Sequence, residues 1–383
     1  MAMSATMTLK VSTRFDGGNA ADIEILSGQE IPEIRFASDP CGGKEALWFH
    51  FRLEESDPDP ARNSKVRITW KYFDSMAGAS ELPLCIPVSG MPDRTWSRLK
   101  QGEESRSQDG MRQLSWLIPH PAPAVEVALC FPYLTSDLDA LLERSTEFWN
   151  STPLGLSQNG NRITRVHNTI GIPGSNQPGF YILARQHAGE TPGSWVLDGL
   201  LRYWSQVKKG GYTIWAIPFV DIDGVKWGHF GPDGFPHDME RSWSNPPLRR
   251  ETKIVTQDIL NWKSRCRPAL ILDFHSPGVC EREGVFAFSG TESDGTFAEE
   301  TKWCNVLKHE LQSEFAAPNF QRQDSCVSSI AHPPFSHFAR NAWGIPALNI
   351  QIPYAQAAGN ILTQKNYREV GKRIGQAMHR RNG

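Results

Sequence analysis

The chain has 383 residues, of which 39 % are hydrophobic, 10 % aromatic and 21 % charged, which excludes a disordered, collagenous or coiled-coil protein. A single hydrophobic core stops growing at roughly 250–300 residues, so the length favours two domains. The 40 Lys and Arg residues nearly balance the 42 Asp and Glu residues, and the formal net charge is −2. Because no basic run is long enough to form a phosphate-binding stripe, we expect no nucleic-acid partner.

The sequence also carries no signal for a membrane or for export. No window approaches 18 consecutive apolar residues, and residues 1–10 contain neither an apolar signal core nor a small-residue cleavage site. The seven cysteines are an odd number, widely scattered and without a C-x-x-C pair, which is typical of reduced thiols. These features predict a cytoplasmic protein that has no membrane partner.

Short strand-like runs separated by Gly, Pro and Asp clusters occupy roughly the first 145 residues. Residues 47–53 and 66–72 alternate between apolar and polar side chains, and residues 124–130 form a third apolar run. Several short strands of this kind predict an all-β sandwich domain over residues 1–148, with a helix at 137–144 leading out of it.

Strand and helix patterns alternate over residues 149–383 and predict an α/β domain with a mainly parallel sheet. We expect buried strands at 180–184, 213–220, 268–274 and 347–352. Amphipathic helices are expected at 194–204, 254–262, 297–315 and 366–379, the first with Ser194 as its N-cap.

Two predicted strands end in side chains that can bind a metal. The run His187-Ala188-Gly189-Glu190 lies between the first strand of the α/β domain and its first helix, and His275 ends the strand at 268–274. Ligands of α/β sheets bind at the carboxyl ends of strands, and zinc takes His and Glu ligands at about 2.0–2.2 Å. The alternative is that His187 caps the helix and His275 is an ordinary buried histidine.

Four segments resemble one enzyme family. The run Arg185–Val196 resembles the zinc-binding loop of the carboxypeptidase A-like metallopeptidases, and in particular of their cytosolic carboxypeptidase branch. The segments 223–225 (D-G-V), 238–243 (D-M-E-R-S-W) and 273–276 (D-F-H-S) resemble further motifs of the family in the same order.

The first half of the chain resembles the N-terminal β-sandwich of that branch in segments 15–19, 48–51 and 131–138. The resemblance therefore covers most of the chain. It implies an α/β fold with a carboxypeptidase-like, mainly parallel mixed sheet flanked by helices, preceded by an all-β sandwich domain.

The resemblance also implies a function. His187, Glu190 and His275 would bind one zinc ion per chain, and Asp238 would hydrogen-bond to a ligand histidine and orient it. Arg241 would recognise the terminal carboxylate of a peptide or a peptide-like small molecule. The expected reaction is hydrolysis of a C-terminal peptide or amide bond by zinc-activated water, with a separate glutamate as general base.

One departure from the family pattern concerns the general base. Gln351 stands at the place of that glutamate, and an amide cannot accept a proton at neutral pH. Three explanations are open: a deliberately inactivated variant, a natural protein that has lost peptidase activity, or a substitute carboxylate, for which Glu281 or Glu283 is the first choice.

Two further departures concern the substrate. Glu240 replaces the asparagine that the family places beside the arginine, and it would repel a substrate carboxylate. The arginine that polarises the scissile carbonyl would fall within residues 231–234, which contain none. Two other functions are therefore considered: a zinc amidase or deacylase acting on a small acyl-amino acid, and a non-catalytic pseudoenzyme that binds zinc or peptide.

Overall fold

The structure is a computed structural model that describes residues 9–55, 65–73, 85–91, 95–119, 124–208, 210–232, 234, 236–323 and 332–382. The chain forms two compact units, one of Met1–Pro132 with Lys226–Phe230 and one of Tyr133–Val225 with Gly231–Gly383. This division assigns helix α2 (Thr135–Glu143) to the second unit, whereas the expected boundary at residue 148 would assign it to the first. The boundary between folding domains at 148/149 stays a prediction.

The first unit contains two five-stranded sheets, which confirms the predicted β-sandwich. One sheet has the order β1-β4-β10-β6-β7, and its strands are Leu9–Ser12, His50–Glu55, Ala124–Ala128, Val88–Gly90 and Trp96–Arg98. The other has the order β2-β3-β5-β9-β8, and its strands are Ala21–Leu26, Glu33–Ala37, Lys65–Lys71, Arg112–Pro119 and Glu103–Arg106.

Aromatic side chains from both sheets fill the core of this unit. Phe36 of β3 lies edge-on to Phe51 of β4 at 4.8 Å, and Trp70 of β5 contacts Phe49 at 5.2 Å. The expected alternation over residues 47–53 is only partly right. Trp48 and His50 are buried as well, because the Trp48 indole donates to the Gly17 carbonyl and the His50 imidazole lies 3.2 Å from the Glu126 carboxylate.

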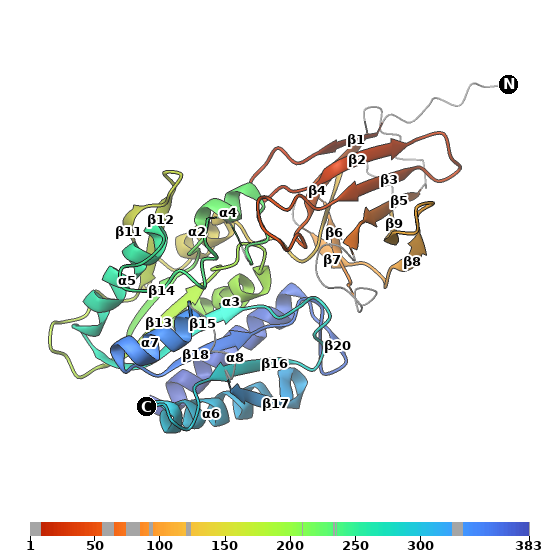
Figure 1. Ribbon diagram of the computed structural model, residues 1–383. Coiled ribbons are helices and arrows are strands. Elements are labelled where there is room, and N and C mark those ends of the chain that lie inside the picture. The colour runs from red at the N-terminus through yellow and green to blue at the C-terminus, as the bar shows by residue number, and fades with distance from the viewer. Residues whose placement is uncertain are drawn as a thin grey trace. The chain divides into compact units, whose positions relative to one another are not determined.

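The second unit contains an eight-stranded mixed sheet of the order β11-β12-β14-β13-β15-β18-β16-β17 (Figure 1). In this order the strands are Asn150–Leu156, Arg162–His167, Thr213–Ile217, Pro178–Ala184, Arg267–His275, Ala347–Gln351, Val285–Ser289 and Ala316–Gln323. The four central strands β14, β13, β15 and β18 are parallel, which confirms the predicted mainly parallel mixed sheet. A short hairpin of β19 (Gln356–Ala357) and β20 (Asn360–Ile361) completes the strands.

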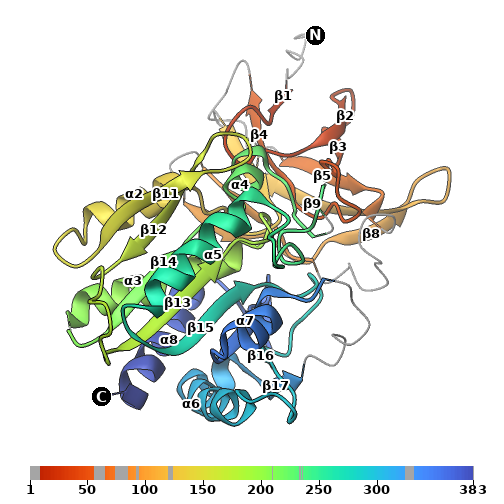
Figure 2. The ribbon, with the colours of Figure 1, turned by 60° about the vertical axis from the view of Figure 1, so that its left-hand side comes forward.

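Helices flank the large sheet, as Figures 1 and 2 show. Helix α8 (Gln364–Asn382) packs against α3 (Thr191–Val207) and α6 (Phe297–Phe315). Helices α5 (Arg250–Lys263) and α7 (Phe335–Trp343) pack against strands of the sheet, and α4 (Ile222–Trp227) is a short helix after β14. Among the helices of the described segments, none is long and apolar enough to span a bilayer.

The start of α3 corrects one prediction. The helix begins at Thr191, so Ser194 lies within the helix and Glu190 occupies the N-cap position. Pro192 lies in the first turn, where a missing backbone N–H costs no hydrogen bond because the first amides of a helix have no partner within it. The turn that carries His187 and Glu190 therefore leads directly into the helix.

Candidate metal centre

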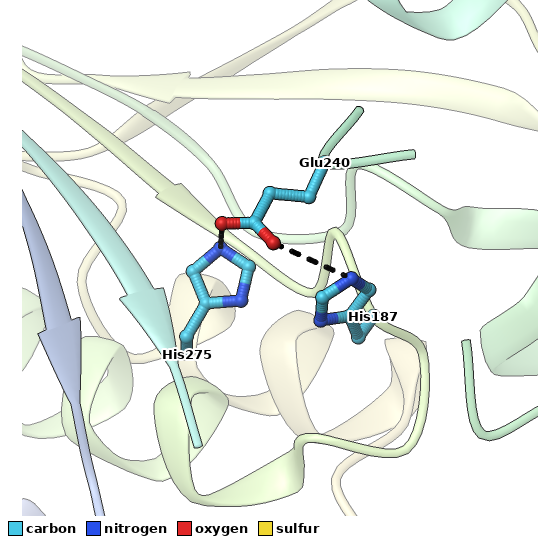
Figure 3. Close-up of side chains that lie close together, drawn as sticks. All are labelled: His187, Glu240 and His275. Carbon is cyan, nitrogen blue, oxygen red and sulfur yellow. Dashed lines mark ion pairs between the residues drawn. The ribbon is translucent and has the colours of Figure 1, made fainter. Parts of the chain in front are cut away.

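Two histidines from neighbouring parallel strands meet at the carboxyl edge of the sheet. His275 is the last residue of β15, and His187 follows β13 after two residues. Their imidazole rings lie 5.0 Å apart in an edge-on arrangement, and the residues are 6 % and 1 % exposed for His187 and His275. Figure 3 shows one nitrogen of each ring turned toward the other ring.

Glu190 lies between these facing nitrogens. Its Oε1 is 2.9 Å from His187 Nδ1, and its Oε2 is 2.9 Å from His275 Nδ1. Burial alone would raise the pKa of the Glu190 carboxyl, but the two imidazoles lower it to about 2. The carboxylate is therefore ionised, and it offers one oxygen to each histidine.

The outer nitrogen of each ring has a carboxylate partner of its own. His187 Nε2 lies 3.1 Å from Asp238 Oδ1, and His275 Nε2 lies 3.1 Å from Asp273 Oδ2. Burial opposes the charged form of both histidines, but the surrounding carboxylates raise their pKa values well above the usual value. Asp238 thus contacts His187 as Asp273 contacts His275, and the sequence does not identify Asp273 as such a partner.

Glu240 is the residue whose position the sequence misses. Its carboxylate is buried and lies 3.9 Å from the Nε2 atoms of both His187 and His275. Figure 3 shows the carboxylate facing both rings. Ligand atoms of His187, Glu240 and His275 lie within 4.8 Å of one another, so this triad is a second candidate metal site. Burial raises the pKa of Glu240, although the nearby imidazoles and Arg241 lower it in part.

Negative charge exceeds positive charge in this cluster. Four carboxylates, those of Glu190, Asp238, Glu240 and Asp273, surround two imidazoles, and all four side chains are at most 12 % exposed. The Arg241 guanidinium adds one positive charge at the margin of the cluster. Its Nη2 lies 3.9 Å from Glu240 Oε2, and its side chain is 37 % exposed. Because burying unbalanced charge is costly, the donor set fits a divalent cation.

The structure brings Gln351 to the same edge of the sheet. Gln351 of β18 is paired with His275 of β15, and its Nε2 donates to Asn349 Oδ1 at 2.6 Å. Asn349 Nδ2 in turn donates to Glu240 Oε1 at 3.1 Å. A chain of hydrogen bonds therefore links the expected position of the general base to the buried carboxylate of Glu240.

The two substitute carboxylates have a different partner. Glu283 Oε2 lies 2.9 Å from Arg322 Nη2, and Glu281 Oε2 lies 3.6 Å from Arg322 Nη1. Glu281 also accepts the backbone N–H groups of Arg282 and Glu283. Both carboxylates are thus held by Arg322 of β17 and by their own loop.

No family model matches the chain, but curated proteins do. It is 21 % identical over 332 residues to cytosolic carboxypeptidase 6 of Caenorhabditis elegans, covering 79 % of this chain and 70 % of that protein. It is 24 % identical over 319 residues to cytosolic carboxypeptidase 2 of Xenopus tropicalis, covering 75 % of this chain and 32 % of that protein. The chain thus spans about a third of the length of the second relative.

Solved structures show the same fold. A metallo-carboxypeptidase from Burkholderia cenocepacia superimposes with a TM-score of 0.79 at 18 % identity, over 97 % of this chain and 98 % of that one. A metallo-carboxypeptidase from Pseudomonas aeruginosa, in complex with (2-guanidinoethylmercapto)succinic acid, gives a TM-score of 0.73 at 19 % identity, over 96 % and 98 % of the two chains. The chain is thus similar in sequence to cytosolic carboxypeptidases over most of its length, and it has the fold of the metallo-carboxypeptidases.

Proposed function

We propose that the chain is a zinc-dependent hydrolase of the metallocarboxypeptidase type, which acts on a C-terminal peptide or amide bond and holds one zinc ion through His187, Glu190 and His275. The observation that carries the proposal is the convergence of two Nδ1 atoms on the two oxygens of Glu190, each at 2.9 Å. Two nitrogen donors and a carboxylate, with a position left for water or substrate, are the ligands of a catalytic zinc site.

The outer shell of the histidines supports Glu190 over Glu240 as the third ligand. With zinc on the Nδ1 side, each Nε2–H donates to its own carboxylate, Asp238 or Asp273, as is usual for metal-bound histidines. Glu240 lies 3.9 Å from both Nε2 atoms, beyond hydrogen-bond distance, and those atoms have closer partners. Zinc held there supplies Lewis acidity toward a substrate carbonyl.

Three residues beside this site, Gln351, Arg241 and Glu240, affect the turnover and the binding of a substrate. Gln351 lies beside His275 but its amide cannot take up a proton, so we expect binding of a substrate with slow turnover. The partly exposed Arg241 guanidinium is suited to a substrate carboxylate. Glu240 partly neutralises that guanidinium and weakens this recognition.

Two alternatives follow from these same departures. Glu240 beside Arg241 favours an amidase or deacylase that acts on a small acyl-amino acid, while Gln351 favours a pseudoenzyme that binds zinc or peptide without turnover. We also propose a cytoplasmic location, which the names of the curated relatives support.

Restoring the expected base tests the proposal. We predict that Gln351→Glu raises the rate of C-terminal peptide hydrolysis roughly 10²-fold, because a carboxylate in this position accepts the proton that an amide cannot. The measurement compares both proteins on a panel of C-terminal peptides, their C-terminal amides and N-acyl amino acids.

The panel also separates the three candidate functions. Faster release of C-terminal residues from free-acid peptides supports a carboxypeptidase, and a gain restricted to N-acyl amino acids indicates the deacylase. No turnover by either protein, with zinc and ligand still bound, indicates the pseudoenzyme and contradicts the proposed activity.

A further inference from the structure

A continuous chain of hydrogen bonds reaches His275 from the side opposite Glu190. The Trp243 indole N–H donates to Gln186 Oε1 at 2.6 Å, and Gln186 Nε2 donates to Asp273 Oδ2 at 2.6 Å. The same Asp273 oxygen lies 3.1 Å from His275 Nε2. All four residues are at most 1 % exposed, so water does not compete for these bonds.

The chemistry of the partners fixes the orientation of the Gln186 amide. An indole N–H can only donate, so it must face the amide oxygen, and an ionised carboxylate can only accept, so it must face the amide NH₂ group. Gln186 therefore connects Trp243 to Asp273 in one direction only.

Asp273 depends strongly on Gln186. Its Oδ2 receives both Gln186 and His275, while its buried Oδ1 has no hydrogen-bond partner. A buried carboxylate needs donors, and hydrogen bonds to an ionised group are roughly twice as strong as neutral ones. Without Gln186, His275 would be the one remaining donor to this side chain within the part of the chain that the structure describes.

The turn that contains Gln186 is held by the preceding residue, Arg185. Arg185, which precedes it, has a φ of +61°, a left-handed conformation that is unfavourable for a non-glycine residue. The Arg185 guanidinium holds the turn by donating to the carbonyls of Ala188 at 2.6 Å and Tyr133 at 3.0 Å. This unfavourable backbone conformation fixes the turn after β13 that carries both Gln186 and His187.

We propose that Gln186, held by Trp243, is a positioning residue of the metal centre: it fixes Asp273, and Asp273 fixes the His275 ring with Nδ1 toward Glu190. Trp243 belongs to the loop that also carries Asp238, the partner of His187. The bond between Trp243 and Gln186 therefore ties together the segments that orient both histidines. The effect on zinc rests on the proposed function, whereas the effect on the His275 ring does not.

The test replaces Gln186 by methionine, which keeps the size and removes the hydrogen bonds to Trp243 and Asp273, together with the 3.5 Å contact of Gln186 Nε2 with His275 Nε2. We expect Gln186→Met to weaken zinc binding roughly 10- to 100-fold in competition with a chelator, the usual effect of losing a group that orients a metal ligand. The visible absorption spectrum of the cobalt-substituted protein should shift as well, because the ligand geometry loosens. Trp243→Phe should weaken zinc binding in the same direction, and the double variant should be less impaired than the two single effects combined.

Tyr181→Phe is the matched control, since it removes a buried hydrogen bond of 2.9 Å to Asp258 from strand β13, which leads into the turn that carries Gln186. It should lower the melting temperature and leave zinc affinity and the cobalt spectrum unchanged. If Gln186→Met behaves like this control, the Gln186 bonds serve stability alone and the proposal is wrong.

A second readout needs no metal. In the metal-free protein the His275 Nε2–H, held by Asp273, should give a slowly exchanging nitrogen-15 NMR signal, and Gln186→Met should speed its exchange. Unchanged exchange overturns the positioning role. Faster exchange in a protein that binds no zinc retains the positioning role and contradicts the proposed function.

Discussion

Each histidine of the centre uses its two ring nitrogens for different partners. The Nδ1 atoms of His187 and His275 share Glu190, while the Nε2 atoms lie against Asp238 and Asp273. A metal ion binds a ring nitrogen that does not donate a hydrogen bond, and the Nε2 atoms donate to Asp238 and Asp273. In the proposed site the metal therefore binds on the Nδ1 side, where Glu190 lies, and not on the Nε2 side, where Glu240 lies. Glu190 and Glu240 can therefore be separated by matched substitutions.

We predict that Glu190→Gln weakens zinc binding at least about 100-fold, because it removes a ligand charge, while Glu240→Gln changes it by less than about 10-fold. Both variants keep the size of the side chain, and each removes one buried negative charge. Chelator competition at fixed pH provides the two affinities. The reverse order would identify Glu240 as the ligand and His187, Glu240 and His275 as the metal triad.

Protons must leave the two histidines when a metal binds. Since the surrounding carboxylates raise the pKa values of His187 and His275 well above the usual value, protonation of both imidazoles is favoured in the metal-free site. We therefore predict that zinc binding releases protons and that the apparent affinity rises with pH. Calorimetry of zinc binding in buffers of different ionisation enthalpy measures the release, and an enthalpy independent of buffer would exclude these histidines as ligands.

At the level of elements, the short helix α4 connects the hairpin of β11 and β12 to the metal-site turn. Asp223 of α4 accepts hydrogen bonds from Ser157 Oγ at 2.5 Å, Asn161 Nδ2 at 2.7 Å and the Asn159 backbone N–H at 3.0 Å. A Cβ on the adjacent Gly224 would lie 2.7 Å from the Ala188 Cβ, so only glycine allows this approach. The D-G-V segment is thus explained by packing.

Asp223→Ala should lower the free energy of unfolding by about 3 kcal/mol, because three donors to a buried carboxylate lose their acceptor. Zinc affinity should stay within about threefold of the unchanged protein, since Asp223 contacts the hairpin turn and not the histidines. Urea denaturation and chelator competition measure the two quantities. A large loss of zinc affinity in folded Asp223→Ala would assign this residue to the metal centre instead.

The sequence predicts the central strands of the eight-stranded sheet well and its two edge strands poorly. The strands ending at Ala184, His275 and Gln351 have continuous apolar runs because helices cover both faces of the sheet, so their patterns are clear. Strand β17 reads AAPNFQRQ, with few apolar residues and a proline, and strand β11 also contains a proline. Such edge strands have no periodic signal, so the sequence predicts no strand in these regions.

For the molecule as a whole, the sequence likewise predicts some contacts of the candidate metal site and misses others. The proximity of His187, Glu190 and His275 is predictable because strand ends of a parallel sheet meet at one edge. The approach of Glu240 to the histidines, and the bond from Trp243 to Gln186, arise from a loop without regular structure. Only the folded chain brings that loop back to the sheet, so its spacing in the sequence does not reveal these contacts.

Metal analysis of the purified protein is the most direct test of the central claim, which is that the surplus of buried carboxylates around the two histidines is balanced by zinc. We predict about one zinc ion per chain and loss of most of it in His275→Ala, with Tyr181→Phe as a folded control that retains it. Protein that contains no zinc and gains none when zinc is added, or His275→Ala protein that keeps its full content, would contradict the account.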